Sequence, residues 1–390
     1  MVNYLKNVKT PPYFIQFAPL FVSKRGIILS LILTSKTLFM KKLNSLLLLG
    51  VILIGTLNSC NSDESDSANK QNEDLLVKVN ASTSKSTAPS GIAGVNWADG
   101  RDNFVDGWVI PSGLTAGDSY ATVEAKTNSI LDSFTANING VNTVRIPINP
   151  SSVSESWWNS YSAVIDKATS KGWNVIICCW ESSSARDGKI DDTAKFWTMW
   201  TTVVNKYSAN SKVYFEVFNE PYGYTLSQLT TIYNTFIVNY PGVPKGRILL
   251  SGTGYSENVT GVGADSRFTG CLLSLHNYAF WATRTAAQWQ ADWRSRIGSY
   301  GSRTVITEFG ATMNAGKDYQ NGPQSDNEIA YIVATSDVCR NDKIASVYWP
   351  GLRDGDSYSI QTRGGSGNNI TLSTVSATGV FRLRYGWGLN

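Results

Sequence analysis

Histidine is almost absent from this sequence, because His276 is the only one among 390 residues. Cysteine is also sparse, and none of the five cysteines has the spacing of a metal site. Cys178 and Cys179 are adjacent in a predicted strand and therefore point to opposite faces, while Cys271 and Cys339 lie far apart. We expect no bound metal and buried free thiols, with one disulfide as the alternative.

Acidic residues are missing from the first 59 positions, which hold seven Lys or Arg. The formal charge of +4 comes from this segment, because the other 27 of the 34 Lys and Arg face 30 Asp and Glu, a net charge of −3. No basic face remains for a nucleic-acid partner, and we predict none.

The apolar run over 46–57 is too short to span a membrane comfortably. It follows two lysines in "MKKLNSLLLLGVILIGTLNSC", and the last four residues resemble a bacterial lipobox, although Asn58 departs from the small or β-branched residue usual there. We predict a lipoprotein signal peptide over 40–59 with lipidation at Cys60. An ordinary cleaved signal or a short anchor helix is the alternative.

Two further segments flank this signal. Residues 1–39 are interpreted as a start-site artefact or an extra N-terminal extension. Residues 60–90 are rich in Ser, Asn and acidic residues, which is typical of a flexible tether. Their "SDESDS" resembles the export signal of surface lipoproteins in Bacteroidetes-type bacteria, so we expect an exported outer-membrane lipoprotein at the cell surface, held by its lipid anchor.

From Gly91 onward, strand and helix patterns alternate. Apolar strands without strict alternation suggest a parallel sheet buried on both faces, and eight βα units in about 300 residues fit a (β/α)8 barrel. We predict a single α/β TIM barrel over 91–390. An open doubly wound sheet is the alternative, but "GVNWADG" after the first strand is not a phosphate loop. The predicted strands are 91–98, 143–148, 174–180, 213–220, 247–252, 272–280, 304–311 and 345–351.

The active site of such a barrel gathers at the C-terminal ends of its strands. Two carboxylates stand there, Glu220 at the end of strand four and Glu308 at the end of strand seven. A carboxylate pair about 5–5.5 Å apart serves retaining glycoside hydrolysis, in which one group protonates the leaving oxygen and the other attacks the anomeric carbon. The other polar or aromatic residues at strand ends are Arg145, Asn219, His276, Tyr278 and Trp349.

At these positions the chain resembles glycoside hydrolase family 5. The motifs that carry the resemblance are "FNEP" on strand four, "HNY" on strand six and "TEFG" on strand seven, in order within residues 91–352. The resemblance implies that Glu220 is the acid/base and Glu308 the nucleophile. It also implies that Asn219 holds the sugar 2-hydroxyl.

The remaining roles follow from the same resemblance. Arg145 and Tyr278 would hydrogen-bond the nucleophile and keep it ionised. His276 would line the subsite beside the acid/base, and Trp349 would be the platform under the sugar. The family usually has a His at the end of strand three, where "NVIICCWE" places Trp180 or Glu181. This departure implies an unusual subfamily and puts the common glucan or mannan substrates in doubt.

Several side chains permit two interpretations. Trp180 is either a sugar platform or a core residue, as the abundant aromatic residues can be in general. Glu181 lies near the site or is merely exposed. Glu216 precedes Glu220 on the same strand face and is interpreted as a buried structural carboxylate that needs a partner, with Arg145 as one candidate.

We therefore expect a retaining β-glycosidase that is endo-β-glucanase-like, cleaves a polysaccharide or oligosaccharide, acts as a monomer and needs no cofactor. Two alternatives stay open. One is a catalytically inactive glycan-binding lipoprotein on the same scaffold, and the other is a transglycosylase. The sugar, the linkage and the choice between endo and exo action are not specified by the residues.

Overall fold

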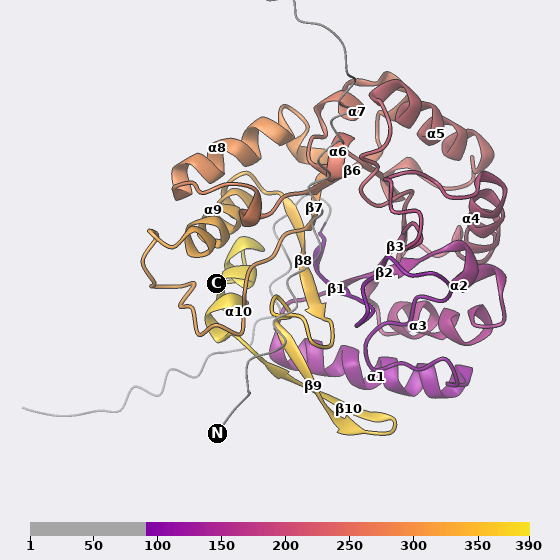
Figure 1. The fold of residues 1–390 in the computed structure, drawn as a ribbon, viewed down its shortest axis with the longest axis horizontal. Coiled ribbons are helices and arrows are strands. Elements are labelled where there is room, and N and C mark those ends of the chain that lie inside the picture. Colours follow the sequence, from indigo (N-terminus) through magenta and orange to yellow (C-terminus); the bar gives the residue numbers. More distant parts are fainter. Residues whose placement is uncertain (1–90) are drawn as a thin grey trace, which may run out of the picture. The chain divides into compact units, whose positions relative to one another are not determined.

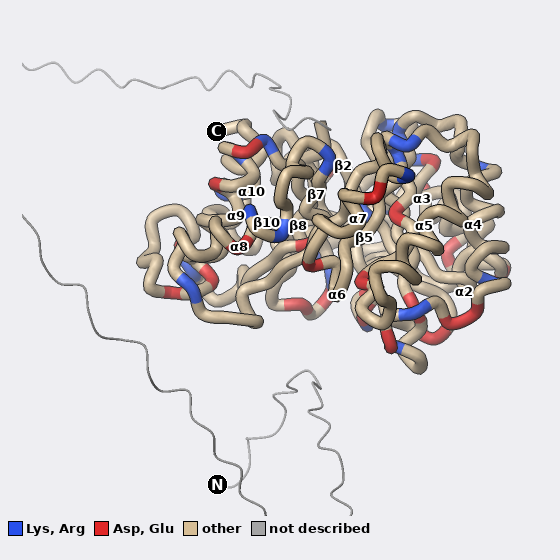
Figure 2. Tube along the Cα trace, turned by 90° about the horizontal axis from the view of Figure 1, so that it is seen from above, with Lys and Arg blue, Asp and Glu red and all other residues tan. Residues whose placement is uncertain are grey.

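The structure is a computed structural model that describes residues 91–390. The predictions for 1–39, 40–59 and 60–90, and for lipidation at Cys60, lie outside the described residues. Among the residues from 91 on, no helix is both long and apolar enough to cross a membrane. Basic and acidic residues are interspersed along this part of the chain (Figure 2).

Eight parallel strands form a closed barrel, and the helices surround it (Figure 1). Closure is shown by the pairing of β1 with β8, which makes the predicted (β/α)8 barrel correct and the open sheet wrong. The strands are β1 (Ala93–Trp97), β2 (Thr143–Ile148), β3 (Asn174–Cys179), β4 (Val213–Glu216), β5 (Ile248–Ser251), β6 (Leu272–His276), β7 (Thr304–Glu308) and β8 (Ala345–Leu352).

The helices follow the strands along the chain, and each long one buries an apolar face against the barrel. Helix starts are set by local sequence: Thr225 with Gln228, and Thr285 with Gln288, form capping boxes before α5 and α8. The helices are α1 (Tyr120–Asn137), α2 (Pro150–Ser154), α3 (Trp158–Ser170), α4 (Thr193–Tyr207), α5 (Leu226–Asn239), α6 (Thr253–Ser256), α7 (Thr260–Ala264), α8 (Ala286–Ile297), α9 (Asn327–Asn341) and α10 (Ala377–Gly386), with short 3-10 turns η1 (Lys245–Arg247), η2 (Ser266–Phe268), η3 (Ala279–Trp281) and η4 (Gly301–Arg303).

The barrel interior is layered from apolar to polar to aromatic. On β6, Leu272 belongs to a small apolar cluster, Ser274 to a polar layer, and His276 to the site at the strand end. At the rim follows a cluster that includes the aromatic side chains of Phe104, Trp180, Tyr278 and Trp349. Since side chains of a strand alternate between faces, every second residue faces this interior.

Two strands end earlier than their sequences suggest. β4 ends at Glu216, so the prediction that Asn219 and Glu220 terminate the strand is wrong. Backbone hydrogen bonds to the neighbouring strands still follow Glu216, from Val217 N–H to the Leu249 carbonyl at 3.2 Å and from Asn219 N–H to the Cys179 carbonyl at 2.8 Å. The chain then departs from extended geometry at Glu220, which has a left-handed φ of 47°. β6 ends at His276, and the segment expected to continue it contains the η3 turn instead.

An antiparallel hairpin extends the sheet beyond the barrel. β9 (Gln361–Ser366) pairs with β10 (Asn369–Thr374), and Leu352 of β8 pairs with Gln361. The hairpin lies beside α1 (Figure 1). The sequence does not indicate this hairpin, because most of its side chains are exposed and form no apolar pattern.

The four cysteines within the described residues are buried and free. The expectation of free thiols is therefore confirmed for Cys178, Cys179, Cys271 and Cys339, and the alternative of one disulfide among them is wrong. Cys178 is also 3.1 Å from an Arg145 nitrogen, so it packs against the polar layer.

Candidate active site

Arg145 of β2 is buried at the centre of a network that joins five barrel strands, because it also contacts residues of β1, β3, β4 and β7. Its Nε and Nη2 donate to the two oxygens of Glu216, at 2.6 and 3.0 Å. Its Nη1 donates to Glu308 Oε1 at 2.5 Å and to Asn96 Oδ1 at 2.9 Å. Its Nη2 also donates to Asn219 Oδ1 at 2.8 Å. The partner that Glu216 requires is therefore Arg145, as the sequence suggested.

Glu308 stands at the end of β7 with a donor on each oxygen. Arg145 donates to Oε1 at 2.5 Å, and the Tyr278 hydroxyl donates to Oε2 at 2.9 Å. His276 Nδ1 lies 3.6 Å from the same Oε2. Both expected partners of this carboxylate are in place, and both favour its charged form.

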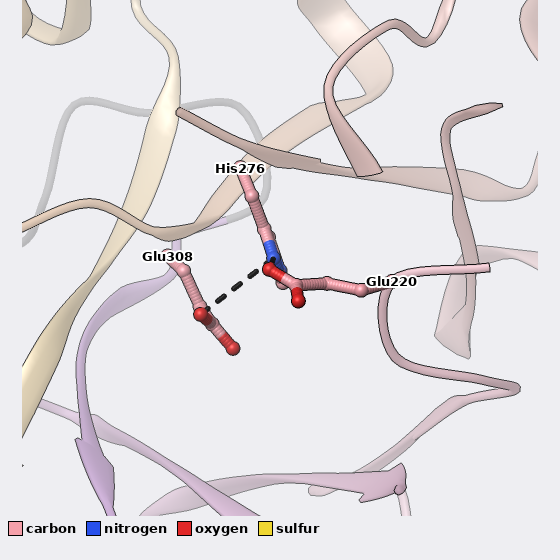
Figure 3. Close-up of side chains that lie close together, drawn as sticks. All are labelled: Glu220, His276 and Glu308. Atoms are coloured by element: carbon pink, nitrogen blue, oxygen red, sulfur yellow. Dashed lines mark hydrogen bonds and ion pairs between the residues drawn. The ribbon is translucent and has the colours of Figure 1, made fainter. Parts of the chain in front are cut away.

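Glu220 reaches the same point from the opposite side of the barrel mouth. His276 Nδ1 lies 3.1 Å from Glu220 Oε1, and the Glu220 backbone N–H donates to the Ser256 hydroxyl at 3.2 Å. Figure 3 shows the side chains of Glu220, His276 and Glu308 converging from separate segments. The Glu220 side chain is 18% exposed, so it is the member of the three that faces the solvent-accessible mouth.

The separation of the two carboxylates is short. One ligand-type atom from each of Glu220, His276 and Glu308 can be chosen so that all three lie within 4.8 Å of one another. Retaining glycosidases have carboxyl groups about 5–5.5 Å apart, whereas inverting enzymes need about 6.5–9.5 Å to admit a water. The geometry therefore matches a direct attack by one carboxylate on the sugar.

The pKa values of the Glu220 and Glu308 carboxyls are set by different surroundings. Burial raises the pKa of Glu220 to about 8, although Arg145 and Arg186 oppose the rise. Burial also raises the pKa of Glu308, but Arg145 touches this carboxylate and opposes the shift. Glu220 thus holds a proton at neutral pH, and Glu308 is the carboxyl with the cation in contact.

The pKa of Glu216 is shifted in the opposite direction, below its usual value. Its burial would raise the pKa, but the charge and hydrogen bonds of Arg145 hold that pKa below the usual 4.5. The Ser274 hydroxyl donates a further hydrogen bond to Glu216 Oε1 at 2.6 Å. Glu216 lies beneath the site, and its oxygens accept hydrogen bonds from the Arg145 and Ser274 side chains. These contacts fit its interpretation as a structural carboxylate.

His276 is neutral and only partly satisfied. Burial lowers its pKa to about 4, so the imidazole is uncharged at neutral pH. Its Nδ1 lies between the two carboxylates, while its Nε2 is buried without a hydrogen-bond partner among the described residues. Asn219 Nδ2 is in the same condition. Because such atoms cost free energy when unpaired, both are candidates to bind a ligand.

Aromatic side chains occupy the rim on the β1, β3 and β8 side. Trp180 and Trp349 stack with ring centroids 5.6 Å apart, and Phe104 meets Trp180 edge-on at 4.6 Å. Both tryptophans are mostly buried. Trp180, one of the two residues that the sequence places where the family usually has a histidine, therefore lies within this aromatic cluster.

Glu181 is buried, so the alternative that it is merely exposed is wrong. Its carboxylate accepts hydrogen bonds from the backbone N–H groups of Asp187, Gly188 and Lys189, at 2.9–3.2 Å. Glu181 therefore holds the loop after β3 in shape. This role depends on a loop conformation that the sequence did not reveal.

Charged residues from three loops meet beside the site, and the sequence did not indicate that they would. Arg186 lies 3.7 Å from Asp102, and its guanidinium packs over Phe104 at 4.1 Å. Arg353 lies 4.0 Å from the same Asp102 carboxylate. The loops after β1, β3 and β8 are thereby joined beside the site, a contact between distant segments that no local motif signals.

The Glu220, His276 and Glu308 atoms are close enough together to serve as ligands of one cation. A cation there would lie beside the Arg145 guanidinium, and both Glu308 oxygens already accept hydrogen bonds from Arg145 and Tyr278. The residues therefore fit an acid–base pair better than a metal centre.

The family model described as cellulase (glycosyl hydrolase family 5) matches residues 112–351. This range includes all the strand-end residues of the site. A comparison with curated proteins finds no significant match.

Solved structures of cellulases share the fold. A thermostable, halotolerant GH5 cellulase from an Icelandic hot spring isolate has a TM-score of 0.53 at 12% identity, covering 76% of this chain and 89% of its own. XacCel5A in complex with cellopentaose has a TM-score of 0.51 at 14% identity, covering 77% and 99%. Cel5A (EG2) from Hypocrea jecorina has a TM-score of 0.50 at 17% identity, covering 75% and 97%.

Proposed function

Because the chain belongs to glycosyl hydrolase family 5, we propose that it is a retaining β-glycosidase that cleaves a polysaccharide or oligosaccharide by double displacement. The observation that carries this proposal is the Glu220–Glu308 pair, whose oxygens lie within 4.8 Å in contrasting surroundings. Glu308 has Arg145 and Tyr278 as donors, whereas no Lys or Arg among residues 91–390 forms an ion pair with Glu220.

In the first step, Glu308 attacks the anomeric carbon while Glu220 gives its proton to the glycosidic oxygen. The carbon–oxygen bond to the leaving sugar breaks, and a bond from the carbon to the Glu308 carboxylate forms. In the second step, Glu220 takes a proton from water, and the resulting hydroxyl displaces Glu308. Both steps use Glu220 and Glu308, and Glu220 acts as an acid in the first step and as a base in the second.

The other buried polar groups support this chemistry. Arg145 is a positioning residue, because all its contacts are to protein side chains and it aims Glu308 and Asn219. Asn219 would hold the sugar 2-hydroxyl through its unpartnered Nδ2, and His276 would accept or donate at its unpartnered Nε2. Trp180 and Trp349 would border the sugar attached to Glu308.

The choice of the first substrates to test rests on the family and on one solved structure. XacCel5A was crystallised with cellopentaose, so cello-oligosaccharides are the first probes to use. Trp180 in place of the usual histidine alters the subsite of the attacked sugar, so β-glucans and β-mannans should be screened together, with sizing of the products. That sizing also separates endo from exo action.

The stereochemical outcome tests the proposal. We expect an aryl β-cellobioside to release the β-anomer of cellobiose first, because two displacements at one carbon restore its configuration. Proton NMR during the first minutes of hydrolysis distinguishes this anomer before it equilibrates in water. Initial release of the α-anomer would exclude the double displacement.

We also propose that the protein is exported and anchored to the outer membrane through a lipid on Cys60, with the barrel at the cell surface. The support is the pair of lysines, the short apolar run and the "LNSC" motif over 40–60. Mass spectrometry of the mature N-terminus should find a diacylated Cys60. An unmodified Cys60 in the mature protein would contradict this anchor.

A further inference from the structure

Glu220 and Ser256 both have a left-handed backbone conformation, which is uncommon for residues other than glycine. Within residues 91–390, five non-glycine residues have a positive φ, and the values for Glu220 and Ser256 are 47° and 56°. An L side chain is crowded against its own backbone in this region, so such residues persist only where their surroundings hold them. The Glu220 N–H donates to the Ser256 hydroxyl at 3.2 Å, so the two strained residues are directly joined.

The backbone of Glu220 has a partner for each of its polar groups. Its N–H donates to Ser256, and its carbonyl accepts from the Tyr222 N–H at 2.8 Å. The Glu220 side chain extends from the segment that follows β4 and not from the strand itself (Figure 3). Hydrogen bonds between strands therefore do not fix this residue, and the two local contacts take their place.

The segment before the acid/base is tied to the strands on both sides of it. On the β5 side, the Ser251 hydroxyl donates to the Phe218 carbonyl at 2.6 Å. On the β3 side, the Asn219 N–H donates to the Cys179 carbonyl at 2.8 Å. The contact with Ser256 continues this series by one residue, so the loop after β5 supplies the backbone contact of the acid/base itself.

Ser256 is fully buried and lies in a tightly closed loop. The Thr253 N–H donates to the Asn258 carbonyl at 3.0 Å, which closes the loop around it. From outside the loop, Arg296 of α8 donates to the Glu257 carbonyl at 2.9 Å. The Ser256 hydroxyl is therefore held in a fixed place, as a group that orients another residue must be.

We propose that Ser256 is a positioning residue for the acid/base: its hydroxyl holds the Glu220 backbone in the left-handed conformation that directs the carboxyl group to the glycosidic oxygen. This inference rests on the proposed function, because it takes Glu220 as the proton donor. Ser256 acts through Glu220 and has no contact with Glu308 in this scheme. Its loss should therefore impair proton transfer and spare the attack on the anomeric carbon.

The test uses two substrates that differ in their need for a proton donor. Phenyl β-cellobioside has a basic leaving oxygen that requires protonation, whereas 2,4-dinitrophenyl β-cellobioside releases a stable anion without it. We expect Ser256→Gly to lower kcat/KM for the phenyl substrate by roughly tenfold or more, and that for the dinitrophenyl substrate by less than about twofold. Glycine suits a φ of 56°, so this variant should keep the fold. Ser256→Ala, which removes only the oxygen, should show the same selective loss.

The second displacement gives an independent measurement on the same variant. Glu220 acts there as the base, and this step limits kcat for the dinitrophenyl substrate because its first step is fast. We therefore expect Ser256→Gly to lower kcat and KM for this substrate together, by roughly tenfold, with kcat/KM nearly unchanged. A smaller amount of folded enzyme would instead lower kcat and leave KM as it is.

Ser152→Ala is the matched control. Ser152 is also fully buried, and its hydroxyl accepts the Val109 N–H at 2.8 Å, but it lies in α2 and its other hydrogen bond is to Asn149. We expect any change in kcat/KM to be the same for both substrates. Glu220→Ala is the reference for a lost proton donor, and it should show the selective loss of Ser256→Gly on a larger scale, roughly 10²–10⁴-fold.

The results separate the role of Ser256 from the proposed function. Equal losses of kcat/KM on both substrates would mean that Ser256 acts through the fold, and no loss on either would mean that Glu220 is held without it; both outcomes overturn the positioning role. A wild type that turns over neither substrate, or a Glu220→Ala variant that loses equally on both, contradicts the proposed function itself, together with the role derived from it.

Discussion

Glu308→Ala should abolish hydrolysis, with kcat on cello-oligosaccharides falling by at least about 10⁴-fold, because no other carboxylate can form the covalent intermediate. The fold should persist, since the change removes a side chain from the rim and leaves the Arg145–Glu216 pair intact. Initial rates with cellobiosyl fluoride and cello-oligosaccharides measure the loss, and thermal unfolding followed by circular dichroism checks the fold.

Azide gives this prediction a second readout. The space left by Glu308 would admit a small anion to the face of the sugar that the carboxylate attacked. We expect azide to restore part of the activity towards cellobiosyl fluoride and to yield the α-glycosyl azide, since a single displacement inverts the carbon. A β-glycosyl azide would assign the nucleophile elsewhere.

Glu181→Gln provides the matched control for the carboxylate. Glu181 is also buried near a strand end, but its oxygens accept from backbone N–H groups of its own loop. An isosteric amide keeps a carbonyl acceptor there, so activity should stay within about tenfold of the wild type. Wild-type-like activity of Glu308→Ala, or a collapse as large in Glu181→Gln, would remove the basis for the assigned nucleophile.

The barrel could be predicted, because each of its strands and long helices has a recognisable pattern of apolar residues within its own short segment. Each strand is a short apolar run, and each long helix repeats its apolar residues at helical spacing, as in α4 with Phe196, Met199 and Trp200. The order of the strands then places their ends on one rim, so Glu220 and Glu308 could be paired from the sequence although 88 positions separate them.

The loop conformations could not be predicted, because they depend on contacts between residues that are far apart in the sequence. Nothing in the sequence near Glu220 indicates that Ser256 accepts its backbone N–H, or that Asp102 lies 3.7 Å from Arg186. These contacts join segments whose conformations depend on one another. Trp180 is an intermediate case, because its position at a strand end was clear but its stacking on Trp349 was not.

The missing histidine of strand three also has a structural consequence. A histidine there would offer a polar edge to the sugar, whereas Trp180 offers an indole packed between Phe104 and Trp349. The catalytic pair does not depend on that position, since its hydrogen bonds come from Arg145, Tyr278 and His276. The departure from the family pattern therefore bears on the sugar-binding part of the proposed site and not on the contacts of Glu220 and Glu308.

Arg145→Met should be the most destabilising single change at the site. The side chain is buried and its guanidinium contacts both Glu216 and Glu308. Methionine fills a similar volume but leaves these two carboxylates buried without a cation, so we expect the free energy of unfolding to fall by about 3–5 kcal/mol. Urea unfolding of the wild type and the variant, followed by tryptophan fluorescence, measures the difference.

The pH dependence of that loss identifies its electrostatic origin. In the wild type, the pKa of Glu216 is held below 4.5, so its contribution is present above that pH and is lost as the pH falls. In the variant, burial without Arg145 raises the pKa of both carboxyls, so stability is retained in acid and lost as the pH rises. The deficit should therefore be larger at pH 8 than at pH 5.

Two further variants serve as a control and as a test of rescue for Arg145→Met. Arg294→Met removes an exposed arginine that pairs with Asp342 at 2.8 Å, and it should cost less than about 1 kcal/mol at either pH. Arg145→Met combined with Glu216→Gln should recover part of the lost stability, because the double variant buries one charge fewer. If Arg145→Met cost no more than Arg294→Met, or if its deficit were the same at both pH values, Arg145 would not be the cation that allows two carboxylates to remain buried beneath the site.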